Sequence, residues 1–295
     1  MNPLTTKKEQ KALALREGYG LTVPESALIE RGLLLAKYLG EKEYTTPEQE
    51  AFNRFIEDYH EAIRLQPDYA DAYKNRGDAY SDFGQNQLAI EDYNEAIRLQ
   101  PDYADAYTNR GTVYSELGQH QRAIEDYNEA ICLKPDLAYA YRYRGDAYSD
   151  LGQYQRAIED YNEAIRLQPD YADAYTNRGN VYSELGQYQR AIEDFSEAIR
   201  LQPDDYLYIK SGNPKVNAYY NRGTASVKLG QYQRAIEDYS KAISLQPDYT
   251  LAYYGRGLAY DKLGNKDEAI NDYKIAAQLG NLSCQKYLKS KGISW

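Results

Sequence analysis

The side chains that could carry out catalysis or bind a metal are few and scattered. The chain has two histidines, His60 and His120, and two cysteines, Cys132 and Cys284, which form no Cys-x-x-Cys pair. Carboxylates are abundant, but they recur at the same places in successive segments and are expected to face solvent, which does not make a general acid–base pair. No glycine-rich phosphate loop or nucleophile motif is present. The sequence therefore predicts no enzyme, no metal site and no bound cofactor.

The composition is rich in tyrosine and acidic overall. The chain has 295 residues, of which 34 are tyrosine against 4 phenylalanines, and its formal net charge is −10. A diffuse acidic field disfavours nucleic acid and anionic membranes as partners and favours basic or neutral ones. The N-terminal stretch lacks the apolar core of a signal peptide, and no apolar run approaches the length of a membrane span. We therefore expect a cytoplasmic protein with no nucleic acid or membrane partner.

A segment of 34 residues recurs along the chain. Five prolines mark its end at this spacing, namely Pro67, Pro101, Pro135, Pro169 and Pro203. In the copy from Asp68 to Pro101, two stretches have helical periodicity and the turn between them contains Gly84. Asp68 is a candidate N-cap, Gly84 suits a left-handed residue after a helix, and Pro101 cannot continue the second helix. Each copy is therefore predicted to be a helix–turn–helix.

The residue types within each copy resemble the tetratricopeptide repeat (TPR). The pattern is aromatic–glycine–aromatic in the first helix, alanine–aromatic–alanine in the second, and then proline. In the first full copy these residues are Tyr73, Gly77, Tyr80, Ala89, Tyr93, Ala96 and Pro101. The resemblance implies an all-α fold, an α-solenoid in which TPR helix–turn–helix units stack into a right-handed superhelix, as a tandem array of bacterial type. The repeated tyrosines are then predicted to be core residues.

The repeat pattern divides the chain into three parts. Residues 1–67 are predicted to be N-terminal capping helices with a degenerate repeat, and residues 281–295 a C-terminal capping helix. Six TPR repeats are expected over residues 68–280, at 68–101, 102–135, 136–169, 170–203, 204–247 and 248–280. The fifth repeat carries a ten-residue insertion. Array ends need capping, which explains the irregular terminal parts.

Several element boundaries outside the regular copies can also be predicted. Helices are expected near residues 5–17 and 26–40, and another begins with Thr46 and Pro47. Asn213 followed by Pro214 reads as an N-cap and first helical position after the insertion. The closing helix is expected to have an apolar side made of Leu282, Tyr287 and Leu288.

An arginine precedes the first-helix glycine in every copy, and an aspartate recurs in every second helix. The arginines are Arg76, Arg110, Arg144, Arg178, Arg222 and Arg256. The aspartates are Asp92, Asp126, Asp160, Asp194, Asp238 and Asp272. We expect a structural Arg–Asp ladder with packed arginine stems. The alternative is an anion-binding stripe, which a carboxylate in each copy would neutralise.

By the resemblance, a partner would bind a concave groove lined by the first helices. The groove residues lie at the second, fifth, sixth and ninth places of each first helix, counted from Ala70 in the first copy. The predicted site residues are Lys74, Asn75, Asp78, Asn109, Thr112, Tyr139, Arg142, Tyr143, Asp146, Asn177, Asn180, Tyr220 and Asn221. Lys74 with Asp78 and Arg142 with Asp146 have the spacing of ion pairs within a helix. No window fits the clamp with which some TPR co-chaperones hold a terminal carboxylate.

The third copy differs from both of its neighbours in the groove. It has Tyr139 and Tyr143 where the second copy has Asp105 and Asn109. The two tyrosines are four residues apart and share a helix face. An aromatic pair among asparagines that can bond to an extended peptide is typical of a binding hot spot. The alternative is chance drift on a tolerant surface.

These observations predict a protein-interaction adaptor or scaffold that binds a peptide or protein segment with basic residues. The alternatives are a self-associating structural array and a regulatory subunit of a separately encoded enzyme, such as a protease. The expected state is a monomer or weak homo-oligomer. The insertion loop at 204–214 is either a partner contact or a tolerated insertion, and the N-terminal segment is predicted chiefly to cap the array.

Overall fold

The computed structural model describes residues 46–202 and 214–295. Over these residues the protein consists of fourteen α-helices, and no strand is present in them. None of the described helices is long and apolar enough to cross a bilayer. The chain divides into two compact units, and the boundary in the sequence falls between Ala147 and Tyr148. The all-α prediction is confirmed.

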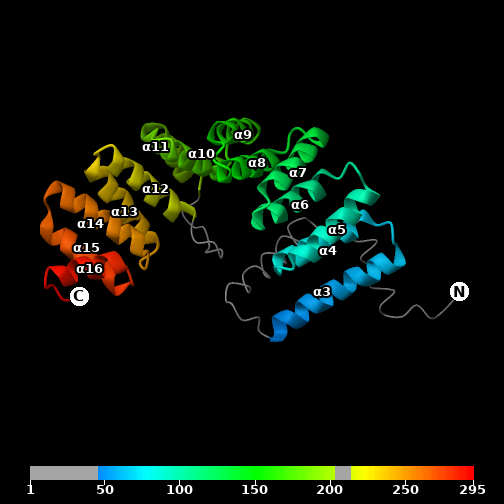
Figure 1. The fold of residues 1–295 in the computed structure, drawn as a ribbon, viewed down its shortest axis with the longest axis horizontal. Helices are drawn as coiled ribbons and strands as arrows, with labels where there is room; N and C mark the ends of the chain where they lie inside the picture. The colour runs from blue at the N-terminus through cyan, green and yellow to red at the C-terminus, as the bar shows by residue number, and fades with distance from the viewer. Residues whose placement is uncertain (1–45, 203–213) are drawn as a thin grey trace. The chain divides into compact units, whose positions relative to one another are not determined.

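The described helices follow one another as hairpins (Figure 1). Their bounds are α3 (Thr46–Leu65), α4 (Ala70–Asp82), α5 (Asn86–Leu99), α6 (Ala104–Glu116), α7 (His120–Leu133), α8 (Ala138–Asp150), α9 (Tyr154–Leu167), α10 (Ala172–Glu184), α11 (Tyr188–Leu201), α12 (Pro214–Lys228), α13 (Tyr232–Leu245), α14 (Thr250–Leu263), α15 (Lys266–Gln278) and α16 (Leu282–Ser290). In the first unit α4 packs on α5 and α6 on α7. In the second unit α10 packs on α11, α12 on α13 and α14 on α15.

The turn inside each hairpin depends on a glycine, as predicted. Gly84 has a φ of 69°, in the left-handed region that favours glycine, and its N–H donates to the Ser81 carbonyl at 2.8 Å. The expected helix start is wrong in detail. Helix α4 begins at Ala70 after Tyr69, without a side-chain cap, so Asp68 is not the N-cap.

In five hairpins the core contains an aromatic ring placed beneath a first-helix glycine, namely Gly77, Gly111, Gly179, Gly223 and Gly257. Tyr127 on α7 is 1% exposed and lies under Gly111 on α6. A Cβ atom at Gly111 would be 2.8 Å from Cε1 of this ring, so only glycine lets the two helices pack at this distance. Tyr80 and Tyr93 are also buried, whereas Tyr73 is half-buried.

The ends of the array agree only partly with expectation. Helix α3 begins at Thr46, as predicted, and its Phe52 ring stacks on Phe83 with ring centroids 3.6 Å apart. Helix α16 packs on α15, and its buried residues are Cys284 and Leu288. Leu282 and Tyr287 are exposed, so their predicted place on the apolar side is wrong.

Of the remaining predicted helix boundaries, one can be compared with the structure and the others lie outside the described residues. Helix α12 begins at Pro214, as predicted. The helices expected near 5–17 and 26–40 lie outside the described residues, as do Asn213 and the insertion loop up to it.

The two cysteines are expected to differ sharply in reactivity. Cys132 is exposed, whereas burial raises the pKa of the Cys284 thiol to about 11. Because the thiolate is the nucleophile, iodoacetamide at about pH 8 should alkylate Cys132 and leave Cys284 intact until the chain unfolds. The pKa of Cys284 is higher in the folded chain than in the unfolded one. Its ionisation therefore lowers the free energy of unfolding as the pH rises above the usual thiol range. Peptide mass spectrometry on the wild type and Cys132→Ser measures this, and equal labelling of both thiols would contradict it.

Candidate protein-interaction surface

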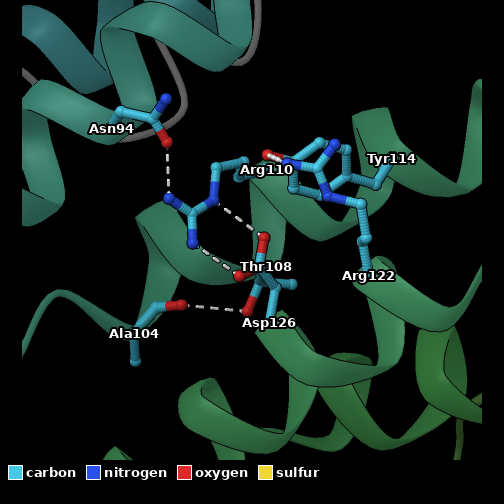
Figure 2. Close-up of polar contacts among 7 residues, drawn as sticks. All are labelled: Asn94, Ala104, Thr108, Arg110, Tyr114, Arg122 and Asp126. Atoms are coloured by element: carbon cyan, nitrogen blue, oxygen red, sulfur yellow. Dashed lines mark hydrogen bonds and ion pairs between the residues drawn. The ribbon is translucent and has the colours of Figure 1, made fainter. Parts of the chain in front are cut away.

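In several repeats one arginine of the first helix bonds to two second helices at once. Arg110 on α6 donates to both carboxylate oxygens of Asp126 on α7, from Nε at 2.8 Å and from Nη2 at 2.6 Å (Figure 2). Its Nη1 donates to Oδ1 of Asn94 on α5, in the preceding repeat, at 2.5 Å. Burial opposes the charge of Arg110, but the hydrogen bonds to Asp126 outweigh it and raise its pKa. We call this arrangement the arginine clamp.

The arginine clamp recurs in both units. The further Arg–Asp pairs are Arg76 with Asp92, Arg178 with Asp194, Arg222 with Asp238 and Arg256 with Asp272. The further bonds to the preceding repeat join Arg144 to Asn128, Arg178 to Asn162, Arg222 to Ser196 and Arg256 to Ser240. In these repeats the ladder is confirmed, and the guanidinium groups that pair with aspartate do not form an anion-binding stripe.

The second, fifth, sixth and ninth places of the first helices form what we call the first-helix face. On its first repeat, Asp78 accepts hydrogen bonds from the Tyr93 hydroxyl and from Nδ2 of Asn109, both at 2.8 Å. The ammonium group of Lys74 lies 2.7 Å from the other carboxylate oxygen of Asp78, which is the predicted ion pair. Asn109 therefore links two repeats and already uses one of its donors.

The third repeat carries a cluster of aromatic and charged groups on this face. The Tyr143 ring lies near-parallel to that of Tyr127, with centroids 6.0 Å apart, and is 6.5 Å from the Tyr139 ring. The Arg142 guanidinium carbon lies 3.9 Å from the centre of the Tyr143 ring. Arg142 also pairs with Asp146 at 2.8 Å, as the spacing predicts. All four side chains from α8 are half-buried.

A compensating exchange explains Tyr139, and sequence reasoning missed it. In the second repeat, the Tyr103 hydroxyl donates to Asp71 of the first repeat at 2.6 Å. The third repeat has Leu137 in place of that tyrosine, and Tyr139, two residues later, donates to Asp105 instead. Burial and then these hydrogen bonds raise the pKa of Tyr103 and of Tyr139. The signal in the sequence was Leu137, where most other copies have tyrosine.

The predicted site residues fall into two groups. The first unit holds Lys74, Asn75, Asp78, Asn109, Thr112, Tyr139, Arg142, Tyr143 and Asp146. The second holds Asn177, Asn180, Tyr220 and Asn221. Within the second unit, Asn221 donates to Asn180 at 2.9 Å, and Tyr220 contacts the rings of Tyr239 and Tyr249. Sequence reasoning did not include the first-helix face of α14, which carries exposed Leu251 and Leu258.

The family models that match the chain are all TPR models. A model described as TPR repeat matches residues 77–118, 145–186 and 223–264. Two models described as tetratricopeptide repeat match residues 104–137 and 172–205, and residues 251–279. Together these matches cover more than half of the chain. No curated protein matches it.

Solved structures of TPR proteins share the fold. YrrB, described as a TPR protein with an unusual peptide-binding site, has a TM-score of 0.52 and 23% identity, over 67% of this chain and 96% of YrrB. A tetratricopeptide repeat protein from Parabacteroides merdae has a TM-score of 0.58 and 23% identity, over 82% of this chain and 93% of that protein. Pseudomonas aeruginosa PilF has a TM-score of 0.63 and 19% identity, over 75% of this chain and 97% of PilF.

The TPR fold is in general a non-catalytic scaffold for protein interactions. The helical hairpins, the aromatic rings beneath first-helix glycines and the matching models fall on the same parts of the chain. The chain belongs to the tetratricopeptide repeat family.

Proposed function

We propose that this chain is a non-catalytic adaptor that binds a peptide or protein segment on the first-helix face of its first unit. The observation that carries the proposal is the cluster of Tyr139, Arg142 and Tyr143 on α8. Large aromatic and arginine side chains dominate the binding energy of protein interfaces. At the same places the second repeat has Asp105, Thr108 and Asn109.

The charge around this cluster indicates the kind of partner. Asp71, Asp82 and Glu116 are exposed on α4 and α6, and Asp78 is half-buried beside them. Such a surface attracts basic side chains, and salt should weaken the attraction because exposed charges are screened. A segment with lysine or arginine beside an apolar group fits both the carboxylates and the tyrosine rings. YrrB, which shares this fold, has a peptide-binding site, and this supports a peptide as the ligand class.

The test exchanges the cluster for the residues of a sibling repeat. Arg142→Thr with Tyr143→Asn reproduces the second repeat, which folds with Thr108 and Asn109 at those places. Affinity capture from native lysate, quantified by mass spectrometry, should recover a partner with the wild type and at least about tenfold less with this variant. The same partner should be released as salt is raised.

A second exchange serves as the matched control. Leu137→Tyr with Tyr139→Asp restores the Tyr103 and Asp71 pattern of the preceding repeat interface, while Arg142 and Tyr143 stay in place. It should retain the partner at least in part. Equal recovery by the wild type and the Arg142→Thr/Tyr143→Asn variant would overturn the proposal. Light scattering that finds a stable oligomer would favour the self-associating array instead.

A further inference from the structure

Helix α14 presents exposed leucines where other repeats present polar groups. Leu251 is 46% exposed and Leu258 is 37% exposed, and the two are seven residues apart on one face of the helix. They occupy the second and ninth places of the first-helix face. The fourth repeat has Asp173 and Asn180 at these places. The hairpin does not need a leucine at either place, because the fourth repeat forms the same hairpin with Asp173 and Asn180.

Aromatic side chains continue this apolar surface around α14. Tyr254 lies between the two leucines and contacts the Tyr273 ring, with centroids 6.3 Å apart. Tyr273 in turn contacts Tyr287 on α16, which is 40% exposed. We call Leu251, Tyr254, Leu258 and Tyr287 the leucine–tyrosine patch.

The place between Tyr254 and Leu258 that holds asparagine in other repeats is Gly255. A Cβ atom at Gly255 would lie 2.7 Å from Cζ of the Tyr239 ring, so this place cannot carry a side chain without displacing that ring. The sixth place of α14 therefore offers no amide to a ligand. The surface beside the leucines is thus less polar than in the repeats that carry asparagine.

Two lysines border the patch. Lys262 is one turn beyond Leu258 on α14, and Lys228 holds the equivalent place on α12, a helix that contacts α14. Both are exposed, and neither has a hydrogen-bond or ion-pair partner among the described residues. The second and fourth repeats have Glu116 and Glu184 at this place. The sign of the charge is therefore reversed next to the apolar patch.

We propose that the second unit carries its own docking surface, which takes an apolar and acidic peptide segment of another protein. Aliphatic side chains of the segment cover the leucine–tyrosine patch, and its aspartate or glutamate side chains pair with Lys228 and Lys262. The two leucines are about 10 Å apart along the helix. A segment in the polyproline II conformation places side chains three residues apart on one face, about 9 Å from each other, which matches this distance. This surface is independent of the α8 cluster, whose acidic surroundings would repel such a segment.

A random-peptide library displayed on phage is the probe that tests this surface. The library is selected against the full-length chain, after depletion on the variant Leu251→Asp/Leu258→Asn. That variant carries the residues of the fourth repeat, so the hairpin should fold, and circular dichroism checks it. The enriched sequences should be net acidic and contain leucine or similar side chains. The best synthetic peptide should lose at least about tenfold in affinity on the depletion variant.

A charge exchange distinguishes specific binding of an acidic peptide from non-specific hydrophobic binding to exposed leucines. Lys228→Glu/Lys262→Glu, which places the glutamate of the fourth repeat at both positions, should weaken the acidic peptide at least about tenfold. Replacing the peptide's glutamates by lysines should restore binding to this variant. Leu185→Ser removes an exposed leucine from the turn after α10 and should change nothing. The variant Arg142→Thr/Tyr143→Asn should also bind the peptide normally, so failure here is distinguishable from failure of the proposed function.

Three outcomes would overturn the proposal. One is a selection that enriches no peptide dependent on Leu251 and Leu258. Another is enrichment of basic peptides, or equal affinity for the glutamate and lysine forms of one peptide. The third is a concentration-dependent dimer that Leu251→Asp/Leu258→Asn abolishes, which would assign the patch to a second copy of this chain.

Discussion

Replacing Asp126 by alanine is expected to lower the free energy of unfolding by about 3–5 kcal/mol. The change leaves the Arg110 guanidinium buried in the hairpin without the carboxylate that accepts two of its hydrogen bonds. A buried charge that loses its partner keeps the whole cost of leaving water. Urea denaturation followed by circular dichroism measures the effect. Solenoid repeats contact mainly their neighbours, so the loss should appear first as local unfolding around α6 and α7.

Two further variants make this test decisive. Glu95→Ala removes the carboxylate of an equally short but exposed pair with Arg98, and it should cost far less. Replacing Arg110 and Asp126 together by leucine removes both charges and should recover most of the loss. If Asp126→Ala were no more destabilising than Glu95→Ala, the arginine clamp would not be what holds the hairpin and its neighbour together.

Truncating Tyr127 to alanine is expected to cost about 3–5 kcal/mol. Its ring fills the space beneath Gly111, which has no side chain of its own to occupy that space. The cavity left behind adds to the lost burial of the ring. Thermal and urea unfolding of Tyr127→Ala against the wild type give the magnitude.

The matched control keeps the ring and removes only the hydroxyl. Tyr127→Phe should cost less than about 1 kcal/mol, because the hydroxyl makes a single long contact of 3.4 Å with Thr112, and the fourth repeat has Phe195 at this place. Tyr93→Phe should cost more, since that hydroxyl donates to Asp78 at 2.8 Å. Equal effects of the two phenylalanine variants would show that the hydrogen bond to Asp78 has no net value.

The elements were predictable from sequence because their determinants are local and repeated. Gly84, the prolines that end the first five copies and the 34-residue period define hairpins without knowledge of long-range contacts. The pairing of Arg110 with Asp126 was also within reach, since both recur at fixed places. The third bond of that arginine was not. The acceptor of this bond is Asn94 for Arg110 and Ser240 for the equivalent Arg256, so no constant residue type marks the acceptor position.

The surface chemistry was less predictable than the fold. Tyr139 was expected to be an aromatic anchor for a partner, but its hydroxyl donates a hydrogen bond to Asp105. It does so because Leu137 stands at the place where most copies have the donor tyrosine. Leu282 was assigned to the apolar side of α16 from its residue type alone, but Leu282 is exposed and Cys284 is buried. Which face of a terminal helix is covered depends on the preceding hairpin, and a single helix sequence does not contain that information.

The arginine clamp also bears on how such a chain can grow. The second to fifth repeats each bring an arginine that bonds to the repeat before, and an asparagine or serine that accepts a bond from the arginine of the repeat after. Donor and acceptor are therefore inherited together whenever one unit is copied in phase. Duplicating or deleting a whole unit leaves matched ends at the new junction. Array length can thus change by tandem duplication without a second, compensating substitution.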